Sequence, residues 1–380
     1  MGSILTLVMQ NKPKILFLVQ LPPPIHGAAI INKYLQDSTA ISNYFDTKFL
    51  NIATANEIKD IGSFSIKKII KTVLLYFRVL KLILQENFEV VYITLSPVGL
   101  AFFKDGLFVV IAKLFRRKVV IHLHGKGIAL EREKNFIFEK LYRFIFNNTY
   151  CICLSNTLVK DIFGLRVKKC FILNNGVQTQ VLNYSINLKK NKTIQLLFLS
   201  NLIKEKGIIE FLEVCKRLTE LNVKYKARII GKPYDIKETN INEFVSANNI
   251  VDKIEYQGAK YSTEKNDILS KTDILIFPTK YKNEAFPLVL LEAMQFGIVP
   301  IATSEGGILD IIQDEKTGFI VSNTSIVDAI VKKVIFLEKS REILAEMSEN
   351  CRNDFFSKYT IEKFEENTIN IFNEVLIDTI

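Results

Sequence analysis

The sequence predicts an α/β protein of two Rossmann-like domains, each built around a parallel sheet. Its 380 residues, of which 48% are hydrophobic, can bury two separate cores. Short apolar, β-branched runs alternate with helical segments, a pattern typical of doubly wound parallel sheets. The runs fall into two series on either side of a polar, turn-rich stretch at 174–192, which we interpret as the linker.

The apolar runs predict the strands in chain order. The first series contains four predicted strands, at Lys14–Gln20, Glu89–Ser96, Lys118–Gly125 and Thr149–Ser155. The second contains five, at Thr193–Asn201, Tyr225–Gly231, Lys253–Gly258, Asp273–Pro278 and Ile298–Thr303. We place the N-terminal domain at 1–182 and the C-terminal domain at 188–360, and expect a helix over 358–380. Because ligands bind outside the carboxyl ends of strands in open α/β sheets, the two sheets are expected to face one interdomain cleft.

The segment 283–321 is the most informative for function. Pro287 is expected in the first turn of a short apolar helix that ends at Gly297. This spacing leaves Glu284 before the helix and puts Glu292 inside it. The unpaired N–H groups at a helix start favour an anion or a hydroxyl. Two carboxylates beside such a start could hold two sets of hydroxyls on one ligand.

Several patterns in this segment together indicate a family. In order, they are the E-x7-E spacing from Glu284 to Glu292, an EAM-x-x-G-x-x-P run that ends at Pro300, the pair Gly306-Gly307, and the turn Asp314–Gly318 ahead of an apolar strand. In combination they resemble the GT-B glycosyltransferases of the GT4 type (glycosyl transferases group 1), which use nucleotide sugars. The similarity extends more weakly through the first half of the chain.

The resemblance implies a GT-B fold and a set of site residues. Glu284 is expected to hold hydroxyls of the donor sugar, and Glu292 the ribose diol. The remaining donor-binding residues are expected to be Gly27, Asn201, Lys206, Ala285, Phe286, Pro287 and Leu288. Gly231 and Gly258 end predicted strands and are expected to line the base pocket of the donor site, with ordinary strand-terminating glycines as the alternative. The resemblance also implies a retaining reaction, in which the leaving phosphate helps to deprotonate the acceptor. It further implies that a C-terminal helix at about 361–380 crosses back to the first domain.

Lys206 is the predicted phosphate-binding cation. It lies with Gly207 at a helix start, where a cation and the helix dipole could together receive a diphosphate leaving group. Similar enzymes commonly have G-R-L ahead of this lysine, whereas this chain has Ser200-Asn201-Leu202. Without that arginine, Lys206 must neutralise more of the charge. When the glycosidic bond of a nucleotide-diphosphate sugar breaks, negative charge develops on the departing diphosphate.

The three histidines form a second group of candidates. His122 and His124 alternate on one side of a predicted strand, and His26 precedes Gly27 after a Pro-rich turn. The resemblance favours His124, beside Gly125, as the catalytic residue that faces the reacting sugar. His26, His122 and Gly125 are assigned to the acceptor or the cleft, although buried structural histidines remain an alternative, above all for His122.

No metal is predicted. The chain has no D-x-D pair to hold Mg²⁺ or Mn²⁺, and the His122/His124 pair lacks a third ligand nearby in sequence. No cofactor is expected, and the nucleotide sugar, with a UDP-sugar favoured, is a substrate. The predicted activity is transfer to a saccharide or lipid-linked acceptor in surface polysaccharide (capsule, O-antigen or exopolysaccharide) biosynthesis. A non-catalytic nucleotide-sugar-binding protein and a GT-B-like sugar-nucleotide epimerase are the alternatives.

Charge and cysteine use bear on location. Residues 1–180 contain 24 Lys and Arg against 11 Asp and Glu, and the densest basic stretch is Ser65–Leu84, where cations lie among aliphatic residues. Such a helix could rest on an anionic membrane surface, or it could be a core-facing helix with solvated lysines. No basic module with stacking aromatics indicates nucleic acid. The start lacks a secretory signal, and five cysteines without CxxC spacing indicate reduced thiols, so a cytoplasmic protein, peripheral on the inner face of the membrane, is expected.

Overall fold

The computed structural model describes residues 12–54, 65–180 and 193–378. The chain forms two compact units, and each is described by itself. Unit 1 comprises Met1–Asn175 and Ile361–Ile380, and unit 2 comprises Gly176–Thr360. The C-terminal helix therefore belongs to the same unit as the N-terminal sheet. The N-terminal segment and the part of the predicted linker at 181–192 lie outside the described residues.

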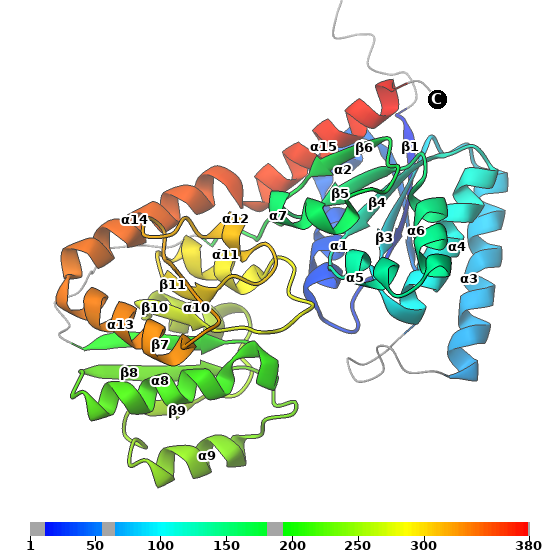
Figure 1. Cartoon of the computed structure of the whole chain (residues 1–380). Coiled ribbons are helices and arrows are strands. Elements are labelled where there is room, and N and C mark those ends of the chain that lie inside the picture. The colour runs from blue at the N-terminus through cyan, green and yellow to red at the C-terminus, as the bar shows by residue number, and fades with distance from the viewer. Residues whose placement is uncertain (1–11, 55–64, 181–192, 379–380) are drawn as a thin grey trace, which may run out of the picture. The chain divides into compact units, whose positions relative to one another are not determined.

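Unit 1 contains a six-stranded parallel sheet with the order β2-β1-β3-β4-β5-β6 (Figure 1). The strands are β1 Lys14–Val19, β2 Asp46–Asn51, β3 Val90–Leu95, β4 Lys118–Leu123, β5 Tyr150–Cys153 and β6 Lys169–Ile172. The four central strands are almost fully buried. Continuous burial on both faces is expected for a parallel sheet that helices cover on each side.

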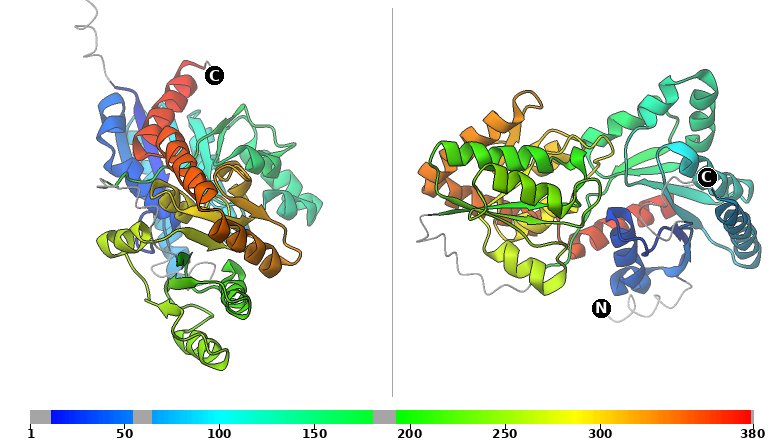
Figure 2. Two further views of the ribbon diagram at one scale, coloured as in Figure 1. Left: turned by 90° about the vertical axis from the view of Figure 1, so that its left-hand side faces the viewer. Right: turned by 90° about the horizontal axis from the view of Figure 1, so that it is seen from below.

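Helices cover both faces of this sheet (Figure 2). They are α1 Gly27–Asp37, α2 Thr39–Tyr44, α3 Ile66–Gln85, α4 Gly99–Leu114, α5 Ile128–Glu133, α6 Phe136–Phe146, α7 Asn156–Val159 and α15 Ile361–Ile377. On one face, α3, α4 and α6 bury residues such as Leu75, Phe108 and Ile145 in a common core. On the other, Phe372 of α15 packs edge-on against Phe17 of β1 and Tyr92 of β3.

Unit 2 contains a second six-stranded parallel sheet with the order β12-β11-β10-β7-β8-β9. The strands are β7 Ile194–Leu199, β8 Tyr225–Ile230, β9 Ile254–Tyr256, β10 Ile274–Phe277, β11 Val299–Thr303 and β12 Phe319–Val321. The helices are α8 Ile208–Glu220, α9 Glu238–Ala247, α10 Ser262–Ser270, α11 Leu288–Gln295, α12 Ile308–Ile311, α13 Ile326–Lys339 and α14 Arg341–Lys358. The prediction of two parallel α/β sheets is confirmed.

Three local predictions need correction. Sequence reasoning missed β2 and β6, which are the two edge strands of the first sheet. The helix expected over 358–380 is interrupted at Tyr359-Thr360, between α14 and α15. Pro287 is not in the first turn of its helix but is the N-cap residue of α11, with an extended backbone (ψ 115°). None of the helices in the described residues has the length and apolarity needed to cross a bilayer.

Candidate active site

The carboxyl edge of the unit 2 sheet brings the loops after its strands together. Gly231, after β8, donates its N–H to the carbonyl of Gly258, after β9, at 2.9 Å. Lys280, after β10, donates to the carbonyl of Glu205, after β7, at 2.7 Å. These backbone contacts are the reason why residues far apart in sequence lie near one another at this edge.

Glu284 lies in the loop between β10 and α11, with only 7% of its surface exposed. Its N–H donates to the Tyr281 carbonyl at 2.9 Å. Its carboxylate forms a close ion pair with the ammonium group of Lys206, and both side chains are largely withdrawn from solvent. The Lys206 Nζ also lies 4.6 Å from the centre of the Tyr281 ring, a cation–π arrangement. Two predicted site residues are therefore in direct contact.

The position of Lys206 depends on a tight turn. Lys204–Lys206 form a single 3-10 turn, and Gly207 is the N-cap of α8 with φ +90°. A Cβ atom at Gly207 would lie 2.4 Å from the carbonyl oxygen of Pro278. Only glycine combines this backbone conformation with this close approach, so the turn holds Lys206 against the loop that carries Glu284.

A Gly-Gly turn braces the Glu284 loop from the other side. Gly307 donates its N–H to the Ala285 carbonyl at 2.6 Å. Gly306 has φ +56°, and a Cβ atom there would lie 2.1 Å from the Glu284 carbonyl oxygen. Ala285 and Phe286 are buried. Pro287 is also buried and Leu288 is half-buried at the start of α11, so this loop is a rigid support for the carboxylate of Glu284.

Glu292 lies inside α11, as predicted, and is half-buried. Its carboxylate accepts a hydrogen bond from the Lys265 ammonium of α10 at 2.8 Å. Each of the two glutamates thus has a lysine partner of its own. Sequence reasoning missed Lys265 and Tyr281, since neither belongs to a recognisable pattern and both become neighbours of the glutamates only through the fold.

Gly231, Gly258 and Asn201 lie at the ends of β8, β9 and β7. A Cβ atom at Gly231 would lie 1.7 Å from the Ser200 carbonyl oxygen, and the Tyr256 hydroxyl donates to the Gly231 carbonyl at 3.0 Å. Gly258 has φ +70° with open space around it. Asn201 is exposed beside this edge. Gly231 therefore allows close backbone packing at this carboxyl edge, whereas Gly258 supplies a left-handed backbone conformation.

Unit 1 brings all three histidines together. The rings of His122, in β4, and His124, just after it, lie 4.0 Å apart, which confirms that they share one side of the strand. His122 Nδ1 and the Tyr92 hydroxyl form a close hydrogen bond. His26 is the N-cap residue of α1, and its Nδ1 accepts the Ala29 N–H at 3.4 Å. Gly27 is the exposed first residue of that helix.

Burial keeps this cluster uncharged. It lowers the pKa of His124 to about 3, with the nearby His26 as a second cause, and it lowers the pKa of His122 well below its usual value. The pKa of His26 is also lowered by burial. In the described part of the chain, the buried Nε2 atoms of His122 and His124 have no hydrogen-bond partner. The cluster can offer hydrogen bonds to a ligand, but not a positive charge.

The loop that carries His124 and Gly125 is held from within unit 1. A Cβ atom at Gly125 would lie 2.9 Å from Cγ of Pro97, in the neighbouring loop after β3. Farther along, the carboxylate of Asp161 accepts the backbone N–H groups of Gly127, Ile128 and Ala129 at 2.8–3.0 Å. Asp161 is a positioning residue that sequence reasoning missed, because its role depends on backbone groups that leave no pattern.

No metal site is evident: the described residues contain no group of three His, Cys, Asp or Glu side chains placed to hold an ion. An open surface hollow in unit 1, lined by residues such as Lys14, Asp46 and Glu86, lies at the amino edge of the sheet and includes none of the predicted site residues. The predicted site residues lie instead at the carboxyl edges of the two sheets.

Comparisons with known proteins agree with this geometry. Residues 183–354 match the family model described as glycosyl transferases group 1. The chain is 26% identical over 204 residues to a lipopolysaccharide 1,2-N-acetylglucosaminetransferase of Salmonella typhimurium, covering 51% of this chain and 52% of that protein. It is 22% identical over 161 residues to the amylovoran biosynthesis glycosyltransferase AmsK of Erwinia amylovora, covering 41% and 39%. The chain spans about half the length of the curated relatives it matches, or less.

Solved structures match along nearly the whole chain. A glycosyltransferase from Rickettsia africae superimposes with a TM-score of 0.73 at 16% identity, covering 97% of this chain and all of that one. Anabaena Alr3699/HepE, solved in complex with UDP, superimposes with a TM-score of 0.71 at 13% identity, covering 95% of this chain and all of that one. At these identities the likeness concerns the fold alone.

The two parallel six-stranded sheets and these structural neighbours define the GT-B fold. Within that class, residues 183–354, which lie in unit 2, match the glycosyl transferases group 1 (GT4) family. The resemblance predicted from segment 283–321 is confirmed.

Proposed function

We propose that this protein transfers a sugar, with retention and without a metal, from a nucleotide-diphosphate sugar to a saccharide or lipid-linked acceptor. A UDP-sugar is the favoured donor, since neighbours of the same fold were solved with UDP. Surface polysaccharide assembly is the proposed setting, because relatives are named for lipopolysaccharide and amylovoran transfer. The proposed location is the cytoplasm, peripheral on the inner face of the membrane.

One observation carries this proposal: Lys206 and Glu284, 78 residues apart in sequence, meet as an ion pair at the carboxyl edge of unit 2. In the proposed mechanism an incoming diphosphate competes with Glu284 for the Lys206 ammonium. The released carboxylate then becomes an acceptor for sugar hydroxyls. Lys206 stabilises the negative charge that develops on the leaving phosphate. A fixed cation stabilises such a developing charge most effectively where water is largely excluded.

The other donor-binding residues have supporting roles in this proposal. Glu292 receives the ribose diol after Lys265 moves aside, and the backbone N–H groups of Ala285, Phe286 and Leu288 at the α11 N-terminus are offered to the donor. Gly231 and Gly258 line the base side, with Asn201 at its rim. The leaving phosphate accepts the proton of the acceptor hydroxyl, so no separate general base is required.

Unit 1 is the proposed acceptor-binding unit. Its neutral histidines suit sugar hydroxyls, which need hydrogen-bond donors and acceptors rather than charge. His124, with its buried and unsatisfied Nε2, is the proposed catalytic member, while His26, His122 and Gly125 shape its surroundings.

The test is a donor screen with purified protein. We expect hydrolysis or transfer of one nucleotide sugar, with UDP-sugars preferred, in the presence of a chelator. Product linkage analysis then defines the anomeric outcome. Saturable binding without turnover across a broad acceptor panel favours a binding protein instead, and conversion of a free UDP-sugar without acceptor indicates an epimerase.

A further inference from the structure

Exposed hydrophobic side chains concentrate on one helical layer of unit 1, the layer formed by α3, α4 and α6. In the described residues, more than half of the exposed large hydrophobic side chains lie on these three helices. They are Ile66, Ile69, Ile70, Val73, Leu74, Phe77 and Leu84 of α3, Leu100, Phe103, Leu107 and Leu114 of α4, and Phe136, Ile137 and Phe144 of α6. We call these residues the exposed apolar face. Such a concentration is unusual for a surface without a partner.

Packing against the core does not explain these residues. The core-facing side of α3 is a separate stripe, formed by Leu75, Val79 and Ile83 at four-residue spacing. Ile70 and Phe77 recur seven residues apart on another side of the same helix, and they are 56% and 65% exposed. Because side chains four and seven residues apart share a face of a helix, α3 has two apolar faces, and only one of them is buried.

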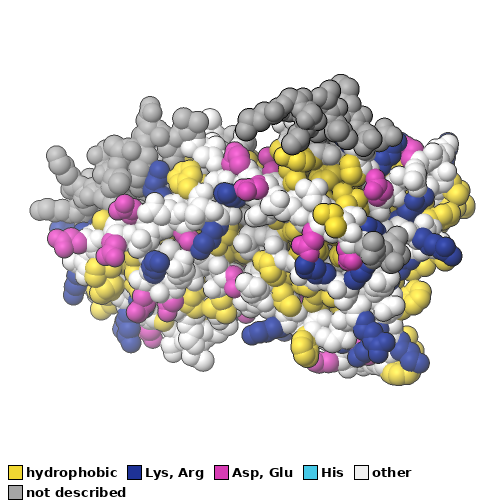
Figure 3. All heavy atoms as spheres, turned by 90° about the horizontal axis from the view of Figure 1, so that it is seen from above, with side chains coloured by type: hydrophobic (Ala, Val, Ile, Leu, Met, Phe, Trp, Pro, Cys, Tyr) yellow, Lys and Arg dark blue, Asp and Glu magenta, His cyan; other side chains and the backbone are white. Residues whose placement is uncertain are grey.

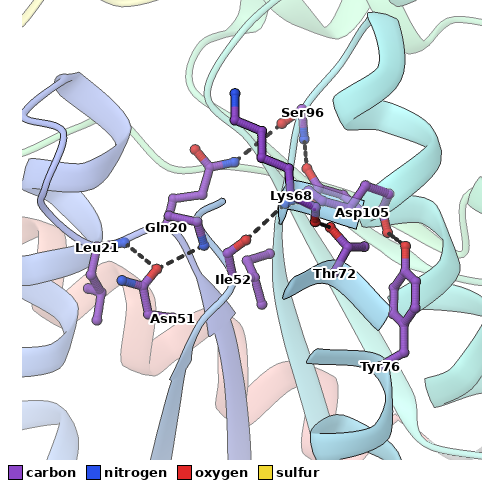
Figure 4. A network of polar contacts seen from close by, with 11 residues as sticks. Gln20, Leu21, Asn51, Ile52, Lys68, Thr72, Tyr76, Ser96 and Asp105 are labelled. Carbon is purple, nitrogen blue, oxygen red and sulfur yellow. Dashed lines mark hydrogen bonds and ion pairs between the residues drawn. The ribbon is translucent and has the colours of Figure 1, made fainter. Parts of the chain in front are cut away.

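Hydrogen bonds hold α3 in this orientation (Figure 4). The Tyr76 hydroxyl donates to the Lys104 carbonyl of α4 at 3.1 Å, and Lys104 Nζ donates to the Ile52 carbonyl after β2 at 3.0 Å. Asp105, fully buried, accepts the Ser96 N–H at 2.9 Å. The Tyr76 contact ties the inner side of α3 to α4, and the contacts of Lys104 and Asp105 tie α4 to the segments after β2 and β3. The exposed apolar face is therefore presented outwards by a fixed framework.

The charge around the exposed apolar face is positive. Helix α3 has no acidic residue, and its exposed cations are Lys67, Lys71, Arg78 and Lys81. The acidic side chains on α4 and α6 are already neutralised by Lys104 and by Arg132 with Arg143, respectively. Lys and Arg side chains alternate with hydrophobic ones along the right-hand margin of unit 1 in Figure 3.

We propose that the exposed apolar face and the α3 cations form a docking surface for an anionic lipid bilayer. Apolar side chains enter the boundary between headgroups and acyl chains, while the cations beside them contact anionic headgroups. Self-association of two copies through this face would bring like charges together, which disfavours a second copy as the occupant. The proposal deepens the peripheral-membrane part of the proposed function and does not depend on the roles of Glu284 and Lys206.

Co-sedimentation with vesicles tests the surface, with phosphatidylglycerol–phosphatidylcholine vesicles compared with pure phosphatidylcholine. We expect binding only to the anionic vesicles, weakened by salt. Replacing three cations together, Lys67→Gln, Lys71→Gln and Arg78→Gln, should lower the partition coefficient on the order of 100-fold. Ile70→Ser with Phe77→Ser should lower it about tenfold or more. The matched control is the exposed trio of unit 2, Lys224→Gln, Lys332→Gln and Lys339→Gln, which should change it little.

A fluorescent reporter identifies the contact itself. The chain contains no tryptophan, so Phe77→Trp introduces a single emitter into the exposed apolar face. Its emission should shift to the blue on addition of anionic vesicles, whereas Phe356→Trp on α14 should not respond.

Three outcomes would each overturn the proposal. The protein could bind neutral vesicles equally well, it could fail to bind any vesicles, or the α3 variants could lose a dimer without any change in vesicle binding. Glu284→Gln should bind vesicles normally, so failure of this proposal and failure of the enzymatic one are distinguishable.

Discussion

The two units prepare their candidate sites by opposite electrostatic means. Unit 2 gathers charges, because Lys206 faces Glu284 and Lys265 faces Glu292. Unit 1 gathers His26, His122 and His124 in an environment that keeps them neutral. Paired charges can exchange partners when an anionic ligand arrives, whereas neutral imidazoles can only exchange hydrogen bonds. In the proposed function, the charged pairs of unit 2 suit a polyanionic donor, and the neutral histidines of unit 1 suit an uncharged hydroxyl.

The strongest test of this contrast is Glu284→Gln, which retains the shape of the side chain but removes its charge. If Glu284 holds the donor sugar in the transition state, kcat/KM should fall roughly 100- to 1,000-fold, as for other preorganised polar groups. Steady-state kinetics with the preferred donor measures this effect. Unchanged turnover would refute the assigned role.

The same substitution also leaves Lys206 without its partner, and loss of one member of a buried pair costs roughly 3–5 kcal/mol of stability. The double variant Glu284→Gln with Lys206→Met removes both charges. We expect it to recover most of the unfolding free energy while turnover stays low. Recovery of activity together with stability would mean that the pair is structural.

A second test strains the support of Glu284 without touching its side chain. In Gly306→Ala, the new Cβ would lie 2.1 Å from the Glu284 carbonyl, so the loop must shift. We expect kcat/KM to fall about 100-fold, the size of effect that a 1 Å misplacement can have. The control is Gly99→Ala, which has φ +70° and open space at the Cβ position. It carries the same backbone strain of roughly 1–2 kcal/mol and should retain activity. Equal losses in both variants would assign the effect to strain alone.

The fold was predictable from sequence where strands are buried on both faces. The central strands of unit 1 are continuous apolar runs such as KILFLV in β1 and VVYITL in β3. The missed strand β2 has the sequence DTKFLN and alternates between exposed and half-buried residues, since an edge strand has a neighbour on one side only. Its signal resembles that of a loop.

The candidate site was predictable only in its local parts. The order of Glu284 outside and Glu292 inside a helix follows from Pro287 and Gly297, although the helix starts one residue later than expected. The partner of each glutamate was not predictable. Lys265 of α10 reaches Glu292 of α11 because the fold of unit 2 brings these two helices within side-chain reach, and spacing in sequence carries no trace of that contact.

The histidine cluster of unit 1 predicts a pH dependence of stability. Burial lowers the pKa of His124 to about 3, so the folded protein binds fewer protons than the unfolded chain below about pH 6.5. Stability should therefore be complete above pH 6.5 and decline as the pH falls towards 3, by at most about 1.4 kcal/mol per pH unit for each such histidine.

The variant His124→Asn removes one titrating group but keeps a hydrogen-bonding side chain. Urea unfolding at pH 7.5 and pH 5.0 should give a smaller difference for the variant than for the wild type. An equal difference would show that His124 is protonated in the folded state, contrary to its burial. The contrast between a neutral unit 1 site and a charged unit 2 site would then fail.

The smallest expected effect comes from restoring a charge at the rim of the unit 2 site. The resemblance implies that similar enzymes commonly have an arginine where this chain has Asn201, which is exposed and lies five residues before Lys206 in sequence. Since an exposed charge contributes about 1 kcal/mol or less, Asn201→Arg should lower the donor KM roughly two- to fivefold. Added salt should reduce the gain, because exposed charges are screened.

The control is Val251→Arg. Val251 is exposed and lies just before β9, at the opposite edge of the sheet, so this substitution adds the same charge and should leave the donor KM unchanged. If both variants lower it equally, general attraction between a basic protein and an anionic donor explains the effect, and Asn201 does not belong to the site.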